Sequence, residues 1–268
     1  MERSFAVIGV GNMARAIIAG IMSADIPVSK FYLFDKNSEA CKIYDDNSKF
    51  YLMESISSAV KEADCVLLSV KPQNYPEVIS ELKNIEGFER KLYISIGAGI
   101  TMKSVSEELC GANVVRVLPN LPMTIGMGVS VICKNDAVPY DDFEFVKSVF
   151  DSAGTTTIID ESDMNAIIGV TSSSPAYVFK FINAICCGAE AQGLRSDAML
   201  DVVCDMVIGS AMLLKQSSDT PLELISKVAS KGGTTEQALI KLNDGDFDKT
   251  IENAMIACTK RANELGKK

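Results

Sequence analysis

The sequence predicts an α/β protein in which a doubly wound parallel sheet is followed by an all-helical domain. In the first part of the 268-residue chain, short apolar runs alternate with segments long enough to form crossover helices. This is the pattern of repeated β-α-β units, and apolar runs without polar alternation are typical of parallel strands covered on both faces. From Pro175 onward the chain shows only helical periodicity. We therefore expect a strand-rich domain over residues 1–160 and a helical domain over residues 161–268.

The apolar runs of the first domain are the predicted strands. The runs expected to form the sheet are residues 5–9, 31–35, 65–70, 92–97 and 114–119, with 129–134 and 155–160 as candidates to extend it. A helical stretch over residues 14–24 follows the first run directly. The domain is therefore expected to open with a strand and its crossover helix.

Two helix starts and one amphipathic stretch are found in the second domain. Ser174-Pro175 is typical of an N-cap followed by proline at the first helical position. Thr220-Pro221-Leu222-Glu223 has the pattern of a capping box. The last helix is expected to carry one apolar face, made of Ile251, Met255, Cys258, Ala262 and Leu265.

The segment 176–189 is apolar on most sides of its predicted helix. A helix of this kind needs burial, and a helical domain of about 100 residues is too small to cover it fully. A second copy of the chain is an economical source of cover, so we expect a homodimer or a larger assembly.

Composition excludes several classes of function. Lys and Arg number 26 against 35 Asp and Glu, a formal net charge of −9 that argues against nucleic acid and anionic membranes as partners. No apolar stretch is long enough for a transmembrane helix. The chain contains no histidine. Ser-His-Asp and Cys-His catalysis, imidazole bases and His-ligated metals are therefore excluded.

The eight cysteines are scattered and form no C-x-x-C pair. This spacing argues against a zinc site or a thioredoxin-type motif, and we expect no metal. Several of the cysteines lie in apolar runs, as buried thiols in a reducing compartment do. Because the N-terminal segment runs directly into a strand without a signal-like region, we expect a cytoplasmic protein.

A glycine motif, Gly9-x-Gly11-x-x-Ala14, lies between the first predicted strand and its helix. Gly9 would permit the tight turn, Gly11 would let the backbone approach a pyrophosphate, and Ala14 would let the helix pack closely on the sheet. The alternative is a glycine-rich turn without a ligand. The strand before the motif and the helix after it favour a dinucleotide-binding, Rossmann-type domain.

Asp35 ends the second predicted strand, where an acidic residue commonly accepts hydrogen bonds from the adenosine ribose. Its carboxylate would repel a 2′-phosphate, and the nearest cation in the local sequence is Lys36. A solvated loop aspartate is the alternative. The first interpretation favours NADH over NADPH.

Two loops follow predicted strands at the carboxyl edge of the sheet, where doubly wound sheets bind ligands. In Val70-Lys71-Pro72, the lysine could contact cofactor or substrate, or could simply be solvated. In Pro119-Asn120-Leu121-Pro122, the two prolines could hold the Asn120 amide against the nicotinamide, or could only make a rigid turn.

The segment Ser230-Lys231-Gly232-Gly233-Thr234-Thr235-Glu236 leads into a predicted helix. Free N–H groups of Gly233, Thr234 and Thr235 could converge on a carboxylate, because a helix N-terminus favours anions. An ordinary helix start with a flexible lead would have the same composition.

Five of these segments recur together in one known family. They are Gly9–Ala14, Val70–Pro72, Pro119–Pro122, Ser173–Phe179 and Gly232–Thr235. In this order, and over the full length, the chain resembles Δ1-pyrroline-5-carboxylate reductase. The resemblance implies a Rossmann domain followed by a helical dimerisation domain, with dimers that often form decamers. It also implies reduction of a cyclic imine to L-proline by NAD(P)H, the last step of proline biosynthesis.

The resemblance also implies roles for individual residues. Cofactor contacts fall on Gly9, Gly11, Asn12, Met13, Ala14, Val70, Lys71, Pro72 and Asn120. The substrate carboxylate falls on the backbone of Gly233, Thr234 and Thr235, with Thr235 near the substrate nitrogen. A cyclic imine protonates in water without a strong enzymic acid, so the lack of histidine fits this reaction. Thr235 is expected to orient the substrate or a proton-donating water.

The chain departs from the family pattern at three positions. It has Ser172 where the family usually has glycine, Lys231 where proline is usual, and Leu121 where threonine is usual. Two alternatives therefore stay open. One is a related imine or ketone reductase for another small acid, and the other is a cofactor-binding scaffold with weak or no catalysis.

Overall fold

The computed structural model describes residues 2–266 and separates them into two compact units. One unit contains the chain up to Ser173 together with the residues from Ile256 onward, and the other is Ser174–Met255. The sequence placed the domain division at residue 160. In the structure, however, the contacts of residues 161–173 and of the residues from Ile256 onward group them with the sheet, and so they belong to its unit.

A small buried cluster explains why these segments join the first unit. It joins α6 (Met164–Ile167) and the C-terminal part of α11 (Phe247–Leu265) to the strands β6 and β7. Its members are Leu118, Val131, Cys133, Met164, Ile168 and Ala262. Although these segments are helical, their apolar contacts with the strands therefore place them in the first unit.

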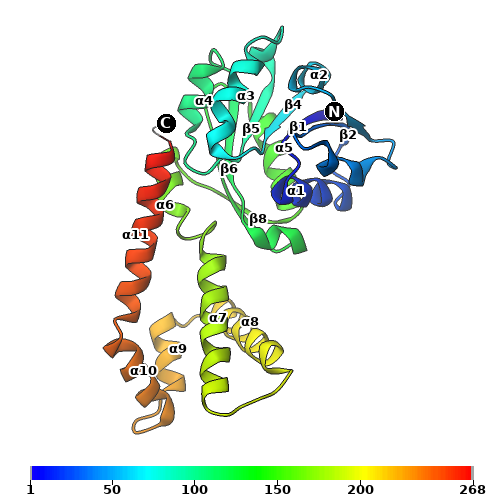
Figure 1. The fold of residues 1–268 in the computed structure, drawn as a ribbon. Helices are drawn as coiled ribbons and strands as arrows, with labels where there is room; N and C mark the ends of the chain where they lie inside the picture. The colour runs from blue at the N-terminus through cyan, green and yellow to red at the C-terminus, as the bar shows by residue number, and fades with distance from the viewer. Residues whose placement is uncertain (1, 267–268) are drawn as a thin grey trace. The chain divides into compact units, whose positions relative to one another are not determined.

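The first unit is built on one eight-stranded sheet in the order β3-β2-β1-β4-β5-β6-β7-β8 (Figure 1). The strands are β1 (Arg3–Ile8), β2 (Val28–Phe34), β3 (Phe50–Leu52), β4 (Cys65–Leu68), β5 (Leu92–Ser95), β6 (Asn113–Leu118), β7 (Gly128–Lys134) and β8 (Gly154–Ile158). The prediction of a doubly wound sheet is confirmed, and all seven expected runs contribute strands. β3 was not predicted, because it is three residues long and buries only Phe50.

One strand pair corrects the expectation of an entirely parallel sheet. β7 runs antiparallel to β6, whereas every other neighbouring pair is parallel. The chain between them holds only the short 3-10 helix η5 (Leu121–Ile125). Since a parallel crossover needs roughly a dozen residues or more, so short a connection returns the chain in the opposite direction.

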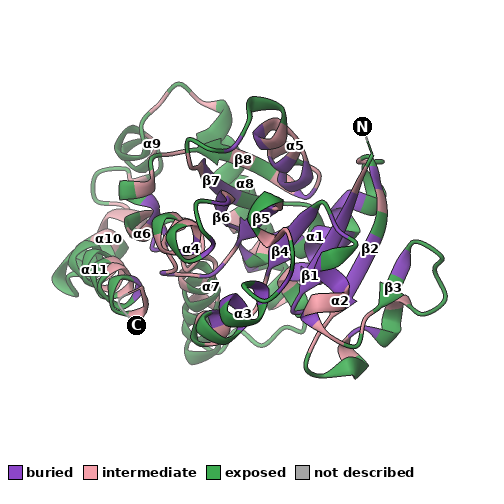
Figure 2. Ribbon diagram, turned by 90° about the horizontal axis from the view of Figure 1, so that it is seen from above, coloured by how far each residue is buried: buried purple, intermediate pink, exposed green. Residues whose placement is uncertain are grey.

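Helices cover both faces of the sheet (Figure 2). Alternate residues of the strands pack into the two opposite layers. In β1, Phe5 and Val7 pack towards α1 (Asn12–Ser23) and α5 (Tyr140–Asp151). Ala6 and Ile8 pack towards α2 (Ile56–Lys61), α3 (Tyr75–Leu82) and α4 (Met102–Glu108). Burial on both faces is why the strands are apolar without alternation.

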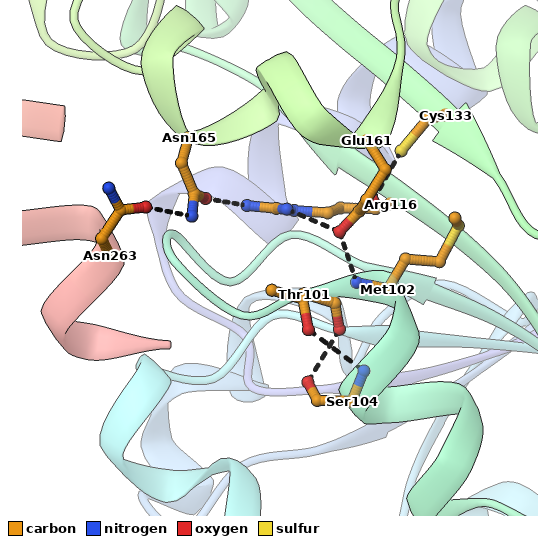
Figure 3. Close-up of polar contacts among 8 residues, drawn as sticks. All are labelled: Thr101, Met102, Ser104, Arg116, Cys133, Glu161, Asn165 and Asn263. Atoms are coloured by element: carbon orange, nitrogen blue, oxygen red, sulfur yellow. Dashed lines mark hydrogen bonds and ion pairs between the residues drawn. The ribbon is translucent and has the colours of Figure 1, made fainter. Parts of the chain in front are cut away.

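A polar network centred on a buried arginine lies beside the small cluster (Figure 3). The Arg116 side chain on β6 is only 1% exposed. Its Nη1 donates to Glu161 Oε1 at 2.9 Å and its Nη2 donates to Asn165 Oδ1 at 2.7 Å. Asn165 in turn donates to Asn263 on α11 at 2.8 Å. This chain of bonds fastens α6 and the end of α11 to the middle of the sheet.

The helical unit consists of α7 (Ser174–Ala191), α8 (Met199–Gln216), α9 (Pro221–Val228), α10 (Thr234–Asp244) and the first part of α11. α7 begins at Ser174, and α9 has the predicted capping box: Glu223 N donates to Thr220 Oγ1, and Thr220 N donates to Glu223 Oε2. No helix within residues 2–266 is both long and apolar enough to cross a membrane.

Large apolar side chains on α7 and α8 are exposed in the single chain. They include Val178, Phe179, Phe181, Leu200, Val202, Ile208 and Leu213. Phe179 alone is 54% exposed. So many exposed apolar residues on neighbouring helices are typical of a surface that another protein chain covers.

Candidate functional site

The glycine motif forms the turn that the sequence predicts. Gly9 has φ +93°, and a Cβ there would lie 3.0 Å from the Ser69 carbonyl carbon. Only glycine therefore fits without strain. Gly11 is the N-cap of α1, and a Cβ there would meet nothing within 4 Å. Ala14 on α1 is 1% exposed and lies in the apolar cluster between this helix and the sheet.

The open space before α1 is suited to an anion. Arg15 N bonds to Gly11 O, but within residues 2–266 the N–H groups of Asn12, Met13 and Ala14 have no protein acceptor. A helix N-terminus with free N–H groups and no side chain in front of it can bind a pyrophosphate. The motif thus fits a dinucleotide.

Asp35 lies beside this turn. Its Oδ2 accepts from Val10 N at 2.7 Å, and its Oδ1 accepts from Asn37 N at 2.9 Å. The carboxylate is fixed by the backbone on both sides. Because each oxygen has a second lone pair, Asp35 can still accept from ribose hydroxyls.

Sequence reasoning missed Arg15 as a cation near Asp35. From α1, its Nε donates to Val10 O at 3.1 Å and its Nη2 donates to Ala40 O at 3.1 Å. Arg15 thus bridges the glycine turn and the segment after β2. Position 15 lies 20 positions before Asp35 in the sequence. The one signal in the sequence was the position of Arg15 in the first turn of α1, from which a long side chain can reach across the glycine turn.

The Val70-Lys71-Pro72 loop follows β4 and leads into α3. Lys71 is exposed. A buried tyrosine fixes the loop: Tyr75 Oη donates to Leu68 O at 2.8 Å and accepts from Gly97 N at 3.0 Å. Burial raises the pKa of Tyr75 to about 12. Its neutral phenol therefore joins the ends of β4 and β5, a role that the sequence did not suggest.

Asn120 is buried, and its side-chain amide forms hydrogen bonds with backbone groups of two other segments. Its Oδ1 accepts from Val129 N at 2.9 Å and its Nδ2 donates to Thr171 O at 3.1 Å. These bonds agree with the alternative of a rigid turn at this position. A contact with nicotinamide would use the remaining amide hydrogen or lone pair.

In the helical unit, Gly233 is the N-cap of α10. Two of the N–H groups in this lead are already bonded, since Gly233 N donates to Ser230 O and Gly232 N donates to Glu236 Oε2. The expectation of a free Gly233 N–H is therefore wrong for this conformation, because the chain closes into a turn. The N–H groups of Thr234 and Thr235 have no acceptor in the part of the chain that the structure describes.

The first unit thus brings together the glycine turn, Asp35 and the loop after β4. Gly9 lies against Ser69 and Val70, and its N donates to Phe34 O. The carboxyl ends of β1, β2 and β4 therefore meet at one edge, as expected of a doubly wound sheet. No group of three or more potential metal ligands is found within residues 2–266.

Comparison with known proteins extends this picture over the whole chain. A family model described as pyrroline-5-carboxylate reductase dimerisation matches residues 161–265, and one described as NADP oxidoreductase, coenzyme F420-dependent, matches residues 4–99. A pyrroline-5-carboxylate reductase of Glycine max is 32% identical over 96% of this chain and 94% of its own length. One of Methanosarcina acetivorans is 33% identical over 97% of both chains.

The chain belongs to the pyrroline-5-carboxylate reductase family. The resemblance read from the sequence is thereby confirmed, together with the class of enzyme, an oxidoreductase.

Solved structures of the family share the fold. The 1-pyrroline-5-carboxylate reductase of Streptococcus pyogenes superposes with a TM-score of 0.89 at 27% identity, covering 98% of this chain and 99% of its own. The Plasmodium falciparum pyrroline carboxylate reductase, solved with NADP bound, gives 0.88 at 26% identity and 98% coverage of both chains.

The three departures from the usual family pattern lie in different settings. Leu121 begins η5 and is 49% exposed. Lys231 is exposed in the lead to α10. The Ser172 hydroxyl is buried, and within residues 2–266 it has no hydrogen-bond partner. A glycine at position 172 would remove that unsatisfied group.

Proposed function

We propose that this protein reduces Δ1-pyrroline-5-carboxylate to L-proline by hydride transfer from NAD(P)H, the last step of proline biosynthesis. The observation that carries the proposal is similarity to curated reductases at 32–33% identity over 96–97% of the chain. The open N-terminus of α1 at the carboxyl edge of the sheet supports it independently, because it fits a dinucleotide.

In this proposal, residues at the sheet edge hold the cofactor. Gly9 forms the tight turn and Gly11 lets the backbone approach the pyrophosphate, which the free N–H groups of Asn12, Met13 and Ala14 bind. Asp35 accepts hydrogen bonds from the adenosine ribose. The remaining contacts, on the nicotinamide side, come from Val70, Lys71, Pro72 and Asn120. When bound, NAD(P)H would supply the hydride, and the loop after β4, which Tyr75 fastens, would orient the nicotinamide.

The N-terminus of α10 binds the substrate carboxylate in this proposal. The free N–H groups of Thr234 and Thr235 donate to it, and the helix dipole favours its charge. Gly233 takes part by closing the turn that aims these groups. The Thr235 hydroxyl orients the imine nitrogen or a water that protonates it, so no histidine is needed.

A steady-state assay tests the proposed reaction. Purified protein should form proline from pyrroline-5-carboxylate with NADH or NADPH. Faster turnover with a larger-ring imine or a keto acid would favour the related-reductase alternative. Binding of NADH without turnover of any of these substrates would favour the scaffold alternative, which the unsatisfied Ser172 hydroxyl and Lys231 motivate.

We propose that NADH is the preferred cofactor. Replacing Asp35 by serine should narrow or invert the ratio of kcat/KM for NADH to that for NADPH, by about tenfold if one charge-assisted contact decides it. The physical reason is that the carboxylate binds ribose hydroxyls but repels a 2′-phosphate. Asp46→Ser, at an exposed position of the same segment, is the control. A ratio unchanged by Asp35→Ser would show that Asp35 does not face the ribose.

We also propose a homodimer built on the helical unit, with further assembly up to a decamer, acting in the cytoplasm. Sedimentation at micromolar concentration should show a dimer or larger. Phe179→Glu should shift the protein towards monomer, because it places a charge on the apolar surface of α7. Tyr140→Glu, at an aromatic side chain 71% exposed on α5, is the control. A wild-type monomer would contradict the proposal.

A further inference from the structure

An ion pair crosses the sheet edge next to Asp35. Lys36 follows Asp35 directly, and its Nζ donates to Glu77 Oε2 at 2.6 Å. Glu77 lies in the first turn of α3, 41 residues further along the chain. Negative charge is favoured at a helix N-terminus, so the first turn of α3 is a suitable position for a carboxylate.

Three cations on α1 and on the segment after β2 are engaged with other groups. Lys36 is paired with Glu77, and Arg15 donates its Nε and Nη2 to the carbonyls of Val10 and Ala40. Lys42, further along, is paired with Glu39. A 2′-phosphate at the ribose would carry nearly two negative charges and would need a free cation. Among these three, Lys36 is the residue adjacent to Asp35 in sequence.

We propose that Glu77 is a specificity-determining residue that disfavours NADPH by holding the ammonium of Lys36. This inference rests on the proposed dinucleotide function of the same sheet edge. Both side chains are largely exposed, at 60% and 54%, so the lysine is free to swing once its partner is removed. NADH has no 2′-phosphate, so its binding does not require an ion pair with Lys36.

The test is the change Glu77→Gln, which keeps the size of the side chain and removes its charge. The kcat/KM for NADPH should rise about fivefold, because an exposed ion pair contributes up to about 1 kcal/mol. The kcat/KM for NADH should stay within about twofold of the wild-type value. Calorimetric titration with NADPH, in the absence of substrate, should show the same gain in affinity. Glu81→Gln removes an exposed charge from the same helix and should leave the kcat/KM values for NADPH and for NADH unchanged.

The double variant Lys36→Met/Glu77→Gln separates release of the lysine from a general change in charge. If Glu77 acts through Lys36, adding Glu77→Gln to Lys36→Met brings no further gain with NADPH. A gain that persists without Lys36, or one that Glu81→Gln reproduces, overturns the inference. So does an unchanged ratio of NADPH to NADH in Glu77→Gln. Failure of wild-type protein to bind either dinucleotide would instead overturn the proposed function, and this inference with it.

Discussion

Replacing Arg116 by methionine should lower the free energy of unfolding by about 3 kcal/mol, the lower end of the range for breaking a buried ion pair from one side, because Arg116 is buried but Glu161 is 27% exposed. Methionine fills much of the same volume but leaves the Glu161 carboxylate without its cation. Among residues 2–266, Glu161 would keep the Met102 N–H at 2.9 Å and the Cys133 thiol at 3.0 Å as its donors. Asn165 would lose its bond to the guanidinium as well.

A second arginine provides a matched control for this substitution. Arg261 Nη1 lies 2.9 Å from Glu264, the same distance as in the Arg116–Glu161 pair, but its side chain is 61% exposed whereas that of Arg116 is 1% exposed. Arg261→Met should therefore change stability by no more than about 0.5 kcal/mol. Urea unfolding at one protein concentration measures both variants, since assembly would otherwise alter the result.

Adding Glu161→Gln to Arg116→Met tests whether the unpaired charge of Glu161 causes the loss of stability. A neutral amide no longer needs the cation, so the double variant should be more stable than Arg116→Met alone. Equal small losses from Arg116→Met and Arg261→Met would contradict the view that the buried network fastens α6 and α11 to the sheet.

The parts of the fold that the sequence predicted depend on local patterns. Gly9, Gly11 and Ala14 lie within six positions of one another, and Thr220 and Glu223 form their capping box within one helical turn. Each pattern contains its own physical reason, a positive φ or an N–H that needs an acceptor. Such features need no knowledge of the rest of the chain.

The features that the sequence did not predict depend on contacts between distant segments. The ion pair Lys36–Glu77 and the bond between Asn165 and Asn263 join residues 41 and 98 positions apart. Hydrophobic periodicity contains no information about such pairs. The direction of β7 depends on the length of the connection at η5, and a run of apolar residues is the same in either direction.

Widening the turn before α10 should impair substrate binding and leave the cofactor site intact. A Cβ at Gly233 would lie 2.6 Å from Ser230 Oγ and 2.9 Å from Ser230 O. Gly233→Val must therefore open the Ser230–Gly233 turn, which redirects the N–H groups of Thr234 and Thr235. Hydrogen bonds to a charged group contribute about 1.5–3 kcal/mol, so the KM for the imine acid should rise roughly 10- to 100-fold.

The Kd for NADH, measured by fluorescence titration, should stay nearly unchanged in Gly233→Val, because the cofactor residues lie in the other unit. Gly245→Val is the matched control. Gly245 is the C-cap of the same helix, with φ −88°, and a Cβ there would be 3.5 Å from its nearest neighbours, an ordinary contact. Its KM should match that of the wild type. An equal loss of NADH affinity in Gly233→Val would show that the two binding tasks are not divided between the sheet edge and α10.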